Sequence, residues 1–217
     1  MYSRQFRLVR ALILTHVAIG LTVLASAASA DRTVLAPTGD TLGPNSYRAE
    51  FAINPQTKFQ NREWIEFSTP QGIEVDAERF DLSNERKKGY ALSIQYPLTY
   101  SLVSALPAVA VGVRDVTGTG SEHGAFYIAA TKTFRLSDAV HRFVREFKVD
   151  AGAGTGRIGG LFLGAQTKLS SGLRLQAELY KRRPNITLAL PITPHLDVRA
   201  YSLDRQLFYG LSFSVLR

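Results

Sequence analysis

Apolar and polar residues alternate along most of the chain after residue 45, with a period of two. In the segment 90–98, large apolar residues occupy every second position, and small residues, polar residues or proline lie between them. Successive side chains of a strand point to opposite faces, so this run predicts a strand with one apolar and one polar face. The same pattern occurs at 47–54, 73–78, 108–114, 173–180, 185–190, 195–200 and 207–215.

Four further segments show the alternation with interruptions, at 62–68, 124–132, 144–150 and 160–168. With the eight clear runs they predict about twelve strands, each near the ~9–11 residues of a tilted transmembrane strand. Clusters of Gly, Pro, Ser, Asn and Asp separate the runs, which indicates antiparallel hairpins rather than helical crossovers. A short helix at 136–143 is the one expected interruption.

The first thirty residues have the features of a secretory signal peptide. Arg4, Arg7 and Arg10 form a basic start, an apolar stretch follows, and small residues occupy 28–30. The apolar stretch is shorter than the ~20 residues of a membrane-spanning helix, although an uncleaved anchor is the alternative.

Three parts of the chain follow from these patterns. Residues 1–30 are the expected signal peptide, and residues 31–45 form an extended leader that contains two prolines and two glycines. Residues 46–217 form the expected barrel domain. An all-β chain of this size is compatible with one domain.

The alternation alone fits either a membrane barrel or a soluble sheet protein. The strands are long and even, their polar faces carry charges of both signs at mid-strand, and tyrosines lie near the ends of apolar stripes. We therefore predict an all-β, antiparallel, up-and-down β-barrel with a polar lumen in the bacterial outer membrane. The alternative is a soluble periplasmic β-sandwich or lipocalin-like protein that binds a ligand or partner.

Alternation assigns residues to the two faces of this barrel. The candidate lumen-lining residues are the charged members of the polar faces: Arg48, Glu50, Glu74, Asp76, Glu78, Arg114, Arg174, Glu178, Asp197 and Arg199. The candidate lipid-facing residues belong to three clear apolar stripes: Tyr90, Leu92, Ile94, Tyr96, Leu173, Leu175, Leu207, Tyr209, Leu211 and Phe213.

Composition narrows the chemistry further. The chain has 26 Lys and Arg against 18 Asp and Glu, and the two signs are interspersed rather than clustered, so we expect no nucleic-acid partner. There is no cysteine, which excludes disulfides and thiolate metal sites. Stability must then come from a large core or from the bilayer.

No motif predicts an enzyme, a cofactor or a metal. Residues 154–159 match G-x-G-x-x-G, but an alternating run follows instead of the helix that dinucleotide binding requires, so a hairpin turn is expected. His123, His141 and His195 fall in different hairpins without ligand spacing, and His16 lies in the signal peptide.

Two charged groups leave alternatives open. Glu74, Asp76 and Glu78 share one strand face, where they would either set ion selectivity or pair with arginines such as Arg48 and Arg62.

The basic turn at 181–183 would either contact lipid phosphates or be an ordinary solvated turn.

The middle of the chain resembles a known family. The residues that carry this resemblance are the segments 106–116, 118–120 and 127–132, with Ala36-Pro37-Thr38 and Leu42-Gly43-Pro44 near the start. They are similar to the YjbH-type outer-membrane barrels associated with exopolysaccharide production. The chain departs from many outer-membrane barrels at its end, because it lacks a terminal aromatic residue.

The resemblance implies an outer-membrane location and a role in exporting or handling surface polysaccharide, without catalytic residues. We therefore expect a non-enzymatic barrel, porin-like or structural, that is linked to exopolysaccharide export or envelope assembly. Its expected partners are outer-membrane lipid and lipopolysaccharide, the outer-membrane assembly machinery, and polysaccharide.

Overall fold

The computed structural model describes most of the chain after residue 34. It describes residues 35–217 apart from 57–60, 82–87, 101–105, 120–121, 135, 204 and 216–217. The predicted signal peptide at 1–30 lies outside the described residues, as do the first four residues of the predicted leader.

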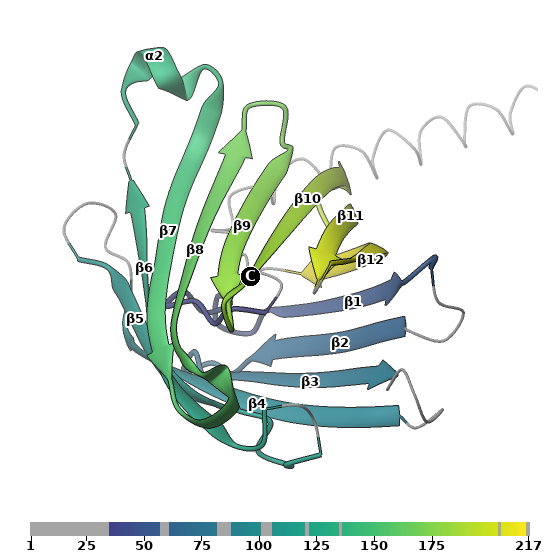
Figure 1. The fold of residues 1–217 in the computed structure, drawn as a ribbon. Helices are drawn as coiled ribbons and strands as arrows, with labels where there is room; N and C mark the ends of the chain where they lie inside the picture. The colour runs from purple at the N-terminus through teal and green to yellow at the C-terminus, as the bar shows by residue number, and fades with distance from the viewer. Residues whose placement is uncertain are drawn as a thin grey trace, which may run out of the picture.

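Twelve antiparallel strands form one closed barrel, as the alternation predicts (Figure 1). They are β1 (Tyr47–Ile53), β2 (Asn61–Ser68), β3 (Glu74–Asp81), β4 (Lys88–Thr99), β5 (Ala108–Arg114), β6 (Ala125–Phe134), β7 (Val144–Gly154), β8 (Gly160–Leu169), β9 (Arg174–Tyr180), β10 (Arg183–Thr193), β11 (Leu196–Leu203) and β12 (Gln206–Val215). Each strand pairs with its sequence neighbours, so the topology is up-and-down.

The barrel closes where the first strand meets the last. β1 pairs with β12 in antiparallel register from Tyr47 opposite Val215 to Ile53 opposite Tyr209. This pairing leaves no open sheet edge, so the backbone groups of both terminal strands are hydrogen-bonded within the sheet.

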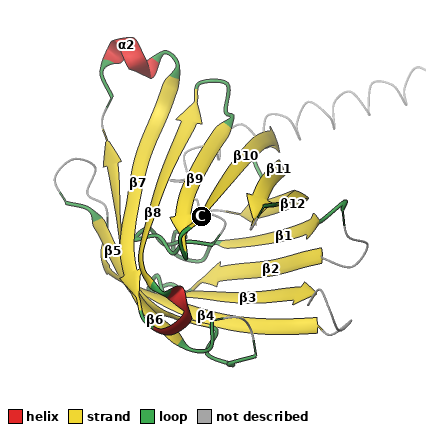
Figure 2. Ribbon diagram, viewed as in Figure 1, coloured by secondary structure: helices red, strands yellow, loops and turns green. Residues whose placement is uncertain are grey.

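The two ends of the barrel differ in their connections. We call the end where β1 begins and β12 ends the near end, and the opposite end the far end. The near end carries the short helix α2 (Asp138–His141), which falls inside the segment predicted to be helical. The far end carries the 3₁₀ turn η1 (Gly156–Ile158), which Figure 2 shows at the opposite end from α2.

The strands place apolar side chains outside and polar ones inside. On β10, outward Leu188 is 42% exposed, whereas its inward neighbour Thr187 is 1% exposed. On β12, outward Leu211 is 52% exposed and inward Ser212 is fully buried. The soluble alternatives predict the reverse arrangement, with the apolar face buried. Among the described residues, no helix has the length and apolar composition to cross a bilayer.

A two-residue turn joins β9 and β10 at the far end. Lys181 and Arg182 both have positive φ angles, of 51° and 62°, and Tyr180 pairs directly with Arg183. Positive φ at both central residues is the requirement of a type I′ turn, whose twist matches that of the flanking strands. Neither residue is a glycine, so the turn carries backbone strain from two Cβ atoms.

We expect Arg182→Gly to raise the free energy of unfolding by about 1 kcal/mol, because glycine adopts positive φ without a Cβ clash. Denaturant unfolding of the purified barrel measures this change. Arg182→Ala is the matched control, since it removes the same charge but keeps the Cβ atom. An equal gain in the alanine variant would show that the charge, and not the backbone, is responsible.

Candidate functional site: the barrel lumen and the segment inside it

Ion pairs that reach across an intervening strand cross-link the lumen wall. Arg199 on β11 bonds Glu50 on β1 at 3.0 Å, although β12 lies between these strands. At this level the inward residues of β12 are Gly210 and Ser212, which leave room for the long arginine side chain. A Cβ atom on Gly210 would lie 3.1 Å from the Cβ of Ala52 on β1. The pair therefore connects the strands on both sides of the closing strand.

The same arrangement recurs elsewhere on the wall. Arg114 on β5 bonds Asp76 on β3 at 3.3 Å, past β4. Arg174 on β9 pairs with Asp197 on β11, past the small Ala189 of β10. These pairs are largely shielded from solvent, where an ion pair is stronger than on an open surface but costs more desolvation.

Pairs between adjacent strands complete this part of the wall. Arg48 and Glu66 lie opposite each other on β1 and β2, with Nη2 and Oε2 at 2.7 Å. The Arg48 guanidinium also lies 4.9 Å from the ring centre of Trp64. Arg62 pairs with Glu78 of β3.

The acidic stripe of β3 is thus partnered along its length. Asp76 bonds Arg114, Glu78 bonds Arg62, and Glu74 accepts a hydrogen bond from the backbone N–H of Leu42 at 2.8 Å. Of the two alternatives for this stripe, these contacts correspond to paired wall charges. All ten candidate lumen-lining residues lie on the inward face: seven are buried, and Glu74, Glu78 and Arg174 are half-buried.

The candidate lipid-facing residues lie on the outer face with one difference. Leu173 precedes β9 and belongs to the β8–β9 turn, where its carbonyl accepts a hydrogen bond from Leu169. The other nine are strand residues, and all of them are exposed except Leu92, which is half-buried.

Residues 35–46 run through the lumen, and we call them the inner segment. Figure 1 shows the start of the described chain, in dark purple, inside the ring of strands. At its far-end side, the Glu178 carboxylate accepts hydrogen bonds from the backbone N–H groups of Leu35 at 3.1 Å and Ala36 at 2.9 Å. Arg114 donates to the carbonyl of Leu35 at 2.8 Å.

Further contacts hold the inner segment along its length. The backbone N–H of Gly39 donates to the Thr131 hydroxyl at 2.8 Å, and Asp40 pairs with Lys148 at 2.9 Å. At the near end, the backbone N–H of Ser68 donates to the Ser46 carbonyl at 2.9 Å, where β1 begins. The inner segment therefore crosses the lumen from the far-end half to the near end.

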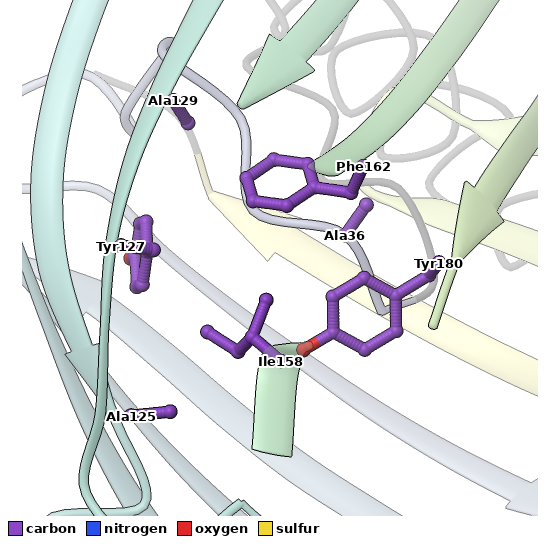
Figure 3. Packing of buried hydrophobic residues seen from close by; sticks show 7 residues of the cluster. All are labelled: Ala36, Ala125, Tyr127, Ala129, Ile158, Phe162 and Tyr180. Atoms are coloured by element: carbon purple, nitrogen blue, oxygen red, sulfur yellow. The ribbon is translucent and has the colours of Figure 1, made fainter. Parts of the chain in front are cut away.

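Aromatic side chains surround the start of the inner segment. Ala36 is fully buried in a cluster with Tyr127, Ile158, Phe162 and Tyr180 (Figure 3). The Phe162 and Tyr180 rings meet edge to face, with their centres 6.1 Å apart. The far-end half of the lumen is thus lined by aromatic faces as well as by charges.

Gly39 lies against the barrel wall without room for a side chain. A Cβ atom there would lie 2.4 Å from the carbonyl oxygen of Ala108 and 2.6 Å from the backbone nitrogen of Thr131. Both atoms belong to the backbone of β5 and β6, which cannot move aside without distorting the sheet. Glycine at this position therefore sets how closely the inner segment approaches the wall.

A cluster around Glu122 lies at the far end of the barrel. Glu122 bonds Arg114 at 3.1 Å, Lys181 at 3.0 Å and the Tyr180 hydroxyl at 2.5 Å. Burial alone would raise the pKa of Glu122, but the two cations and the hydroxyl donor lower it to about 2. Lys181 of the predicted basic turn therefore binds a carboxylate of the barrel.

The structure shows where the remaining sequence motifs lie. Residues 154–159 end β7 and form the η1 turn, and β8 follows them. Within the described residues, no group of three or more His, Asp or Glu is arranged to hold a metal ion. The inner segment is the feature that sequence reasoning missed; its conformation was expected to be extended, but alternation gave no sign of its place in the lumen.

Comparison with known proteins assigns the family. The sequence family described as exopolysaccharide biosynthesis protein YbjH (YjbH) matches residues 57–181, which is more than half of the chain. The chain belongs to the YjbH family. Among solved structures, one described as KdgM porin is similar with a TM-score of 0.49 and 13% sequence identity, covering 78% of this chain and 99% of that chain. No curated protein matches the chain.

For this YjbH-family barrel we expect Gly39→Val to raise the open population, which is the fraction of molecules in which the inner segment is not bound to the wall. The substitution changes no residue of the wall itself. Overpacking of this kind costs roughly 1–3 kcal/mol, which corresponds to an increase of about 5- to 150-fold in the open population. Hydrogen exchange at the Leu35 and Ala36 amides measures that population. Thr41→Val in the same segment is the control, and equal protection in the two variants would contradict the tight fit at Gly39.

The Glu122 cluster predicts a pH dependence of stability. Because the folded pKa of Glu122 is about 2 and its ordinary value is 4.5, its contribution to stability is complete above pH 4.5 and is lost as the pH falls towards 2. Glu122→Gln should lower the free energy of unfolding at pH 7, and it should reduce the loss of stability between pH 4.5 and pH 2. Denaturant midpoints of the parent and the variant between pH 2 and 7 measure this difference. Midpoints that change in parallel with pH in the two proteins would contradict the prediction.

Proposed function

We propose that this YjbH-family chain is a non-catalytic outer-membrane barrel, porin-like or structural, that serves exopolysaccharide export. One observation carries the proposal: a closed sheet exposes apolar side chains around its outer wall and keeps its ion pairs inside. The family description connects the barrel with exopolysaccharide.

The outer wall is the surface that a bilayer would stabilise. Large apolar residues are exposed on nine strands, namely β1, β2, β4, β6, β8, β9, β10, β11 and β12. Extensive exposed apolar surface of this kind marks a membrane or protein contact. Hydrocarbon also requires every backbone group to be paired, and a closed barrel meets this requirement. A water-soluble barrel would gain nothing from this distribution.

Exposed aromatic residues lie towards both ends of the strands, where interfacial girdles of membrane barrels occur. They are Tyr47, Tyr96, Phe134 and Phe213 towards the near end, and Tyr90, Phe126 and Tyr209 towards the far end. By the usual orientation of such barrels, the near end would face the periplasm and the far end the cell exterior. In this setting the outer wall would contact phospholipid and lipopolysaccharide after insertion by the outer-membrane assembly machinery.

The inner segment crosses the lumen in the conformation described here. Eight-stranded barrels are filled by their own side chains, whereas those of 16–18 strands hold an aqueous channel. A twelve-stranded barrel lies between these limits, and here the inner segment runs through its lumen. A polymer that followed the path of the inner segment would have to displace it, whereas a structural role would not require displacement.

Membrane fractionation tests the location directly. The proposal predicts recovery with the outer membrane and a gel mobility that changes on boiling. Recovery in the soluble periplasm without detergent would contradict it.

A pair of substitutions on one strand tests which solvent covers the outer wall. Leu188 and Ile192 both face outwards on β10, Leu188 at its middle and Ile192 near its end. In a bilayer, Leu188→Arg should destabilise the barrel by about 2–4 kcal/mol, and Ile192→Arg by about 0–1 kcal/mol. Unfolding of the barrel from lipid vesicles measures both. If water covered the outer wall, each substitution would change the free energy of unfolding by no more than about 0.5 kcal/mol. Equally small effects of the two substitutions would therefore contradict the proposal.

A further inference from the structure

We propose that the path of the inner segment is a binding site for an uncharged, hydroxyl-rich glycan chain, and that the segment is its intramolecular competitor. This inference rests on the proposed function and names the substrate class of the same lumen. The observation behind it is that the wall holds the inner segment largely through backbone groups, which a different extended polymer can replace.

The bonds to the inner segment are of a kind that sugar hydroxyls also make. Both oxygens of Glu178 accept hydrogen bonds from two successive N–H groups, and Arg114 donates to the carbonyl between them. A carboxylate accepts two donors side by side, and a guanidinium donates in a fixed fork. Two neighbouring hydroxyls of a sugar ring present the same pair of donors to Glu178 and an acceptor to Arg114.

The next stretch of the path offers further polar groups of both kinds. The Thr131 hydroxyl accepts from Gly39 and donates to Asp150, and Gln166 donates to the same Asp150. Gln95 donates to the carbonyl of Asp40. Each hydroxyl of a sugar is both donor and acceptor, so a glycan can satisfy this mixed set when the segment leaves.

Aromatic faces flank the same path. Phe162, Tyr180 and Tyr127 surround Ala36, whose methyl group lies where the apolar face of a sugar ring would pack (Figure 3). A site with a few convergent polar groups between aromatic walls is typical of small-ligand pockets. The far-end half of the lumen therefore combines the two elements of a saccharide site.

The charges of the path favour an uncharged glycan over an acidic one. When the inner segment leaves, Glu178 and Glu74 lose their backbone donors, and Lys148 loses Asp40 but keeps its second acidic neighbour Glu146, at 3.4 Å. A polymer with a carboxylate on every unit would bring like charges next to these glutamates, which disfavours binding.

Titration calorimetry on the full mature chain in detergent micelles tests the site, with cellohexaose as the uncharged probe and a glucuronate hexamer as the acidic probe. Gly39→Val and, independently, Asp40→Lys unseat the inner segment, the second by placing a cation beside Lys148. We expect both variants to bind cellohexaose at least about fivefold more tightly than the parent, because they raise the fraction of open lumen. Equal affinity in parent and variants would overturn the competition.

Substitutions of a ring test the site itself. Phe162→Leu, added to Gly39→Val, should reduce cellohexaose affinity at least about tenfold, whereas Phe147→Leu, on the outer face where Phe147 meets Phe134, should not change it. Thermal midpoints of both double variants confirm folding. Undiminished binding after Phe162→Leu, or tighter binding of the glucuronate hexamer, would overturn the assigned site. Membrane fractionation and the Leu188→Arg and Ile192→Arg variants test the membrane location separately. Failure of the proposed function can therefore be distinguished from failure of the glycan site.

Discussion

The antiparallel pairing of β1 with β12 is the interaction on which the rest of the structure depends. It turns a ribbon with one apolar and one polar face into a closed wall, and closure decides which face is enclosed. Here the polar face is inside, so the charged residues of different strands become neighbours across a narrow space. The Arg199–Glu50 pair lies at this seam and forms only when the first and last strands meet.

Enclosing the polar face creates an energetic requirement that the inner segment helps to meet. Buried carboxylates and guanidinium groups need partners, because an unpaired buried charge is strongly destabilising. Most wall charges find partners on other strands, but Glu178 and Glu74 also use backbone N–H groups of the segment. The segment is therefore part of the polar interior as well as an obstruction in the lumen.

The alternation of residue types predicted the strands, their number and their two faces, because a period of two is a local property of the sequence. It predicted which charges face inwards, but not which pairs form, since Arg114 and Asp76 meet only across an intervening strand. The position of the inner segment was not predictable for a different reason. Carboxylates and hydroxyls bind the backbone of the segment, and backbone groups are the same in every residue, so these contacts leave no pattern in the sequence. Gly39 is the exception, because the wall leaves no room for a side chain there.

Recognition through the backbone also explains how such a segment can be both stable and replaceable. Covalent attachment to β1 gives the segment a high effective concentration in the lumen, so modest contacts keep it in place. A free polymer has no such tether, but it can engage the same wall groups one after another along its length. Displacement would then begin at the far end, where Leu35 and Ala36 lie and where the tether through Ser46 to β1 is most distant. The covalent connection at the near end would let the segment return once the polymer has left, so that closure needs no second component.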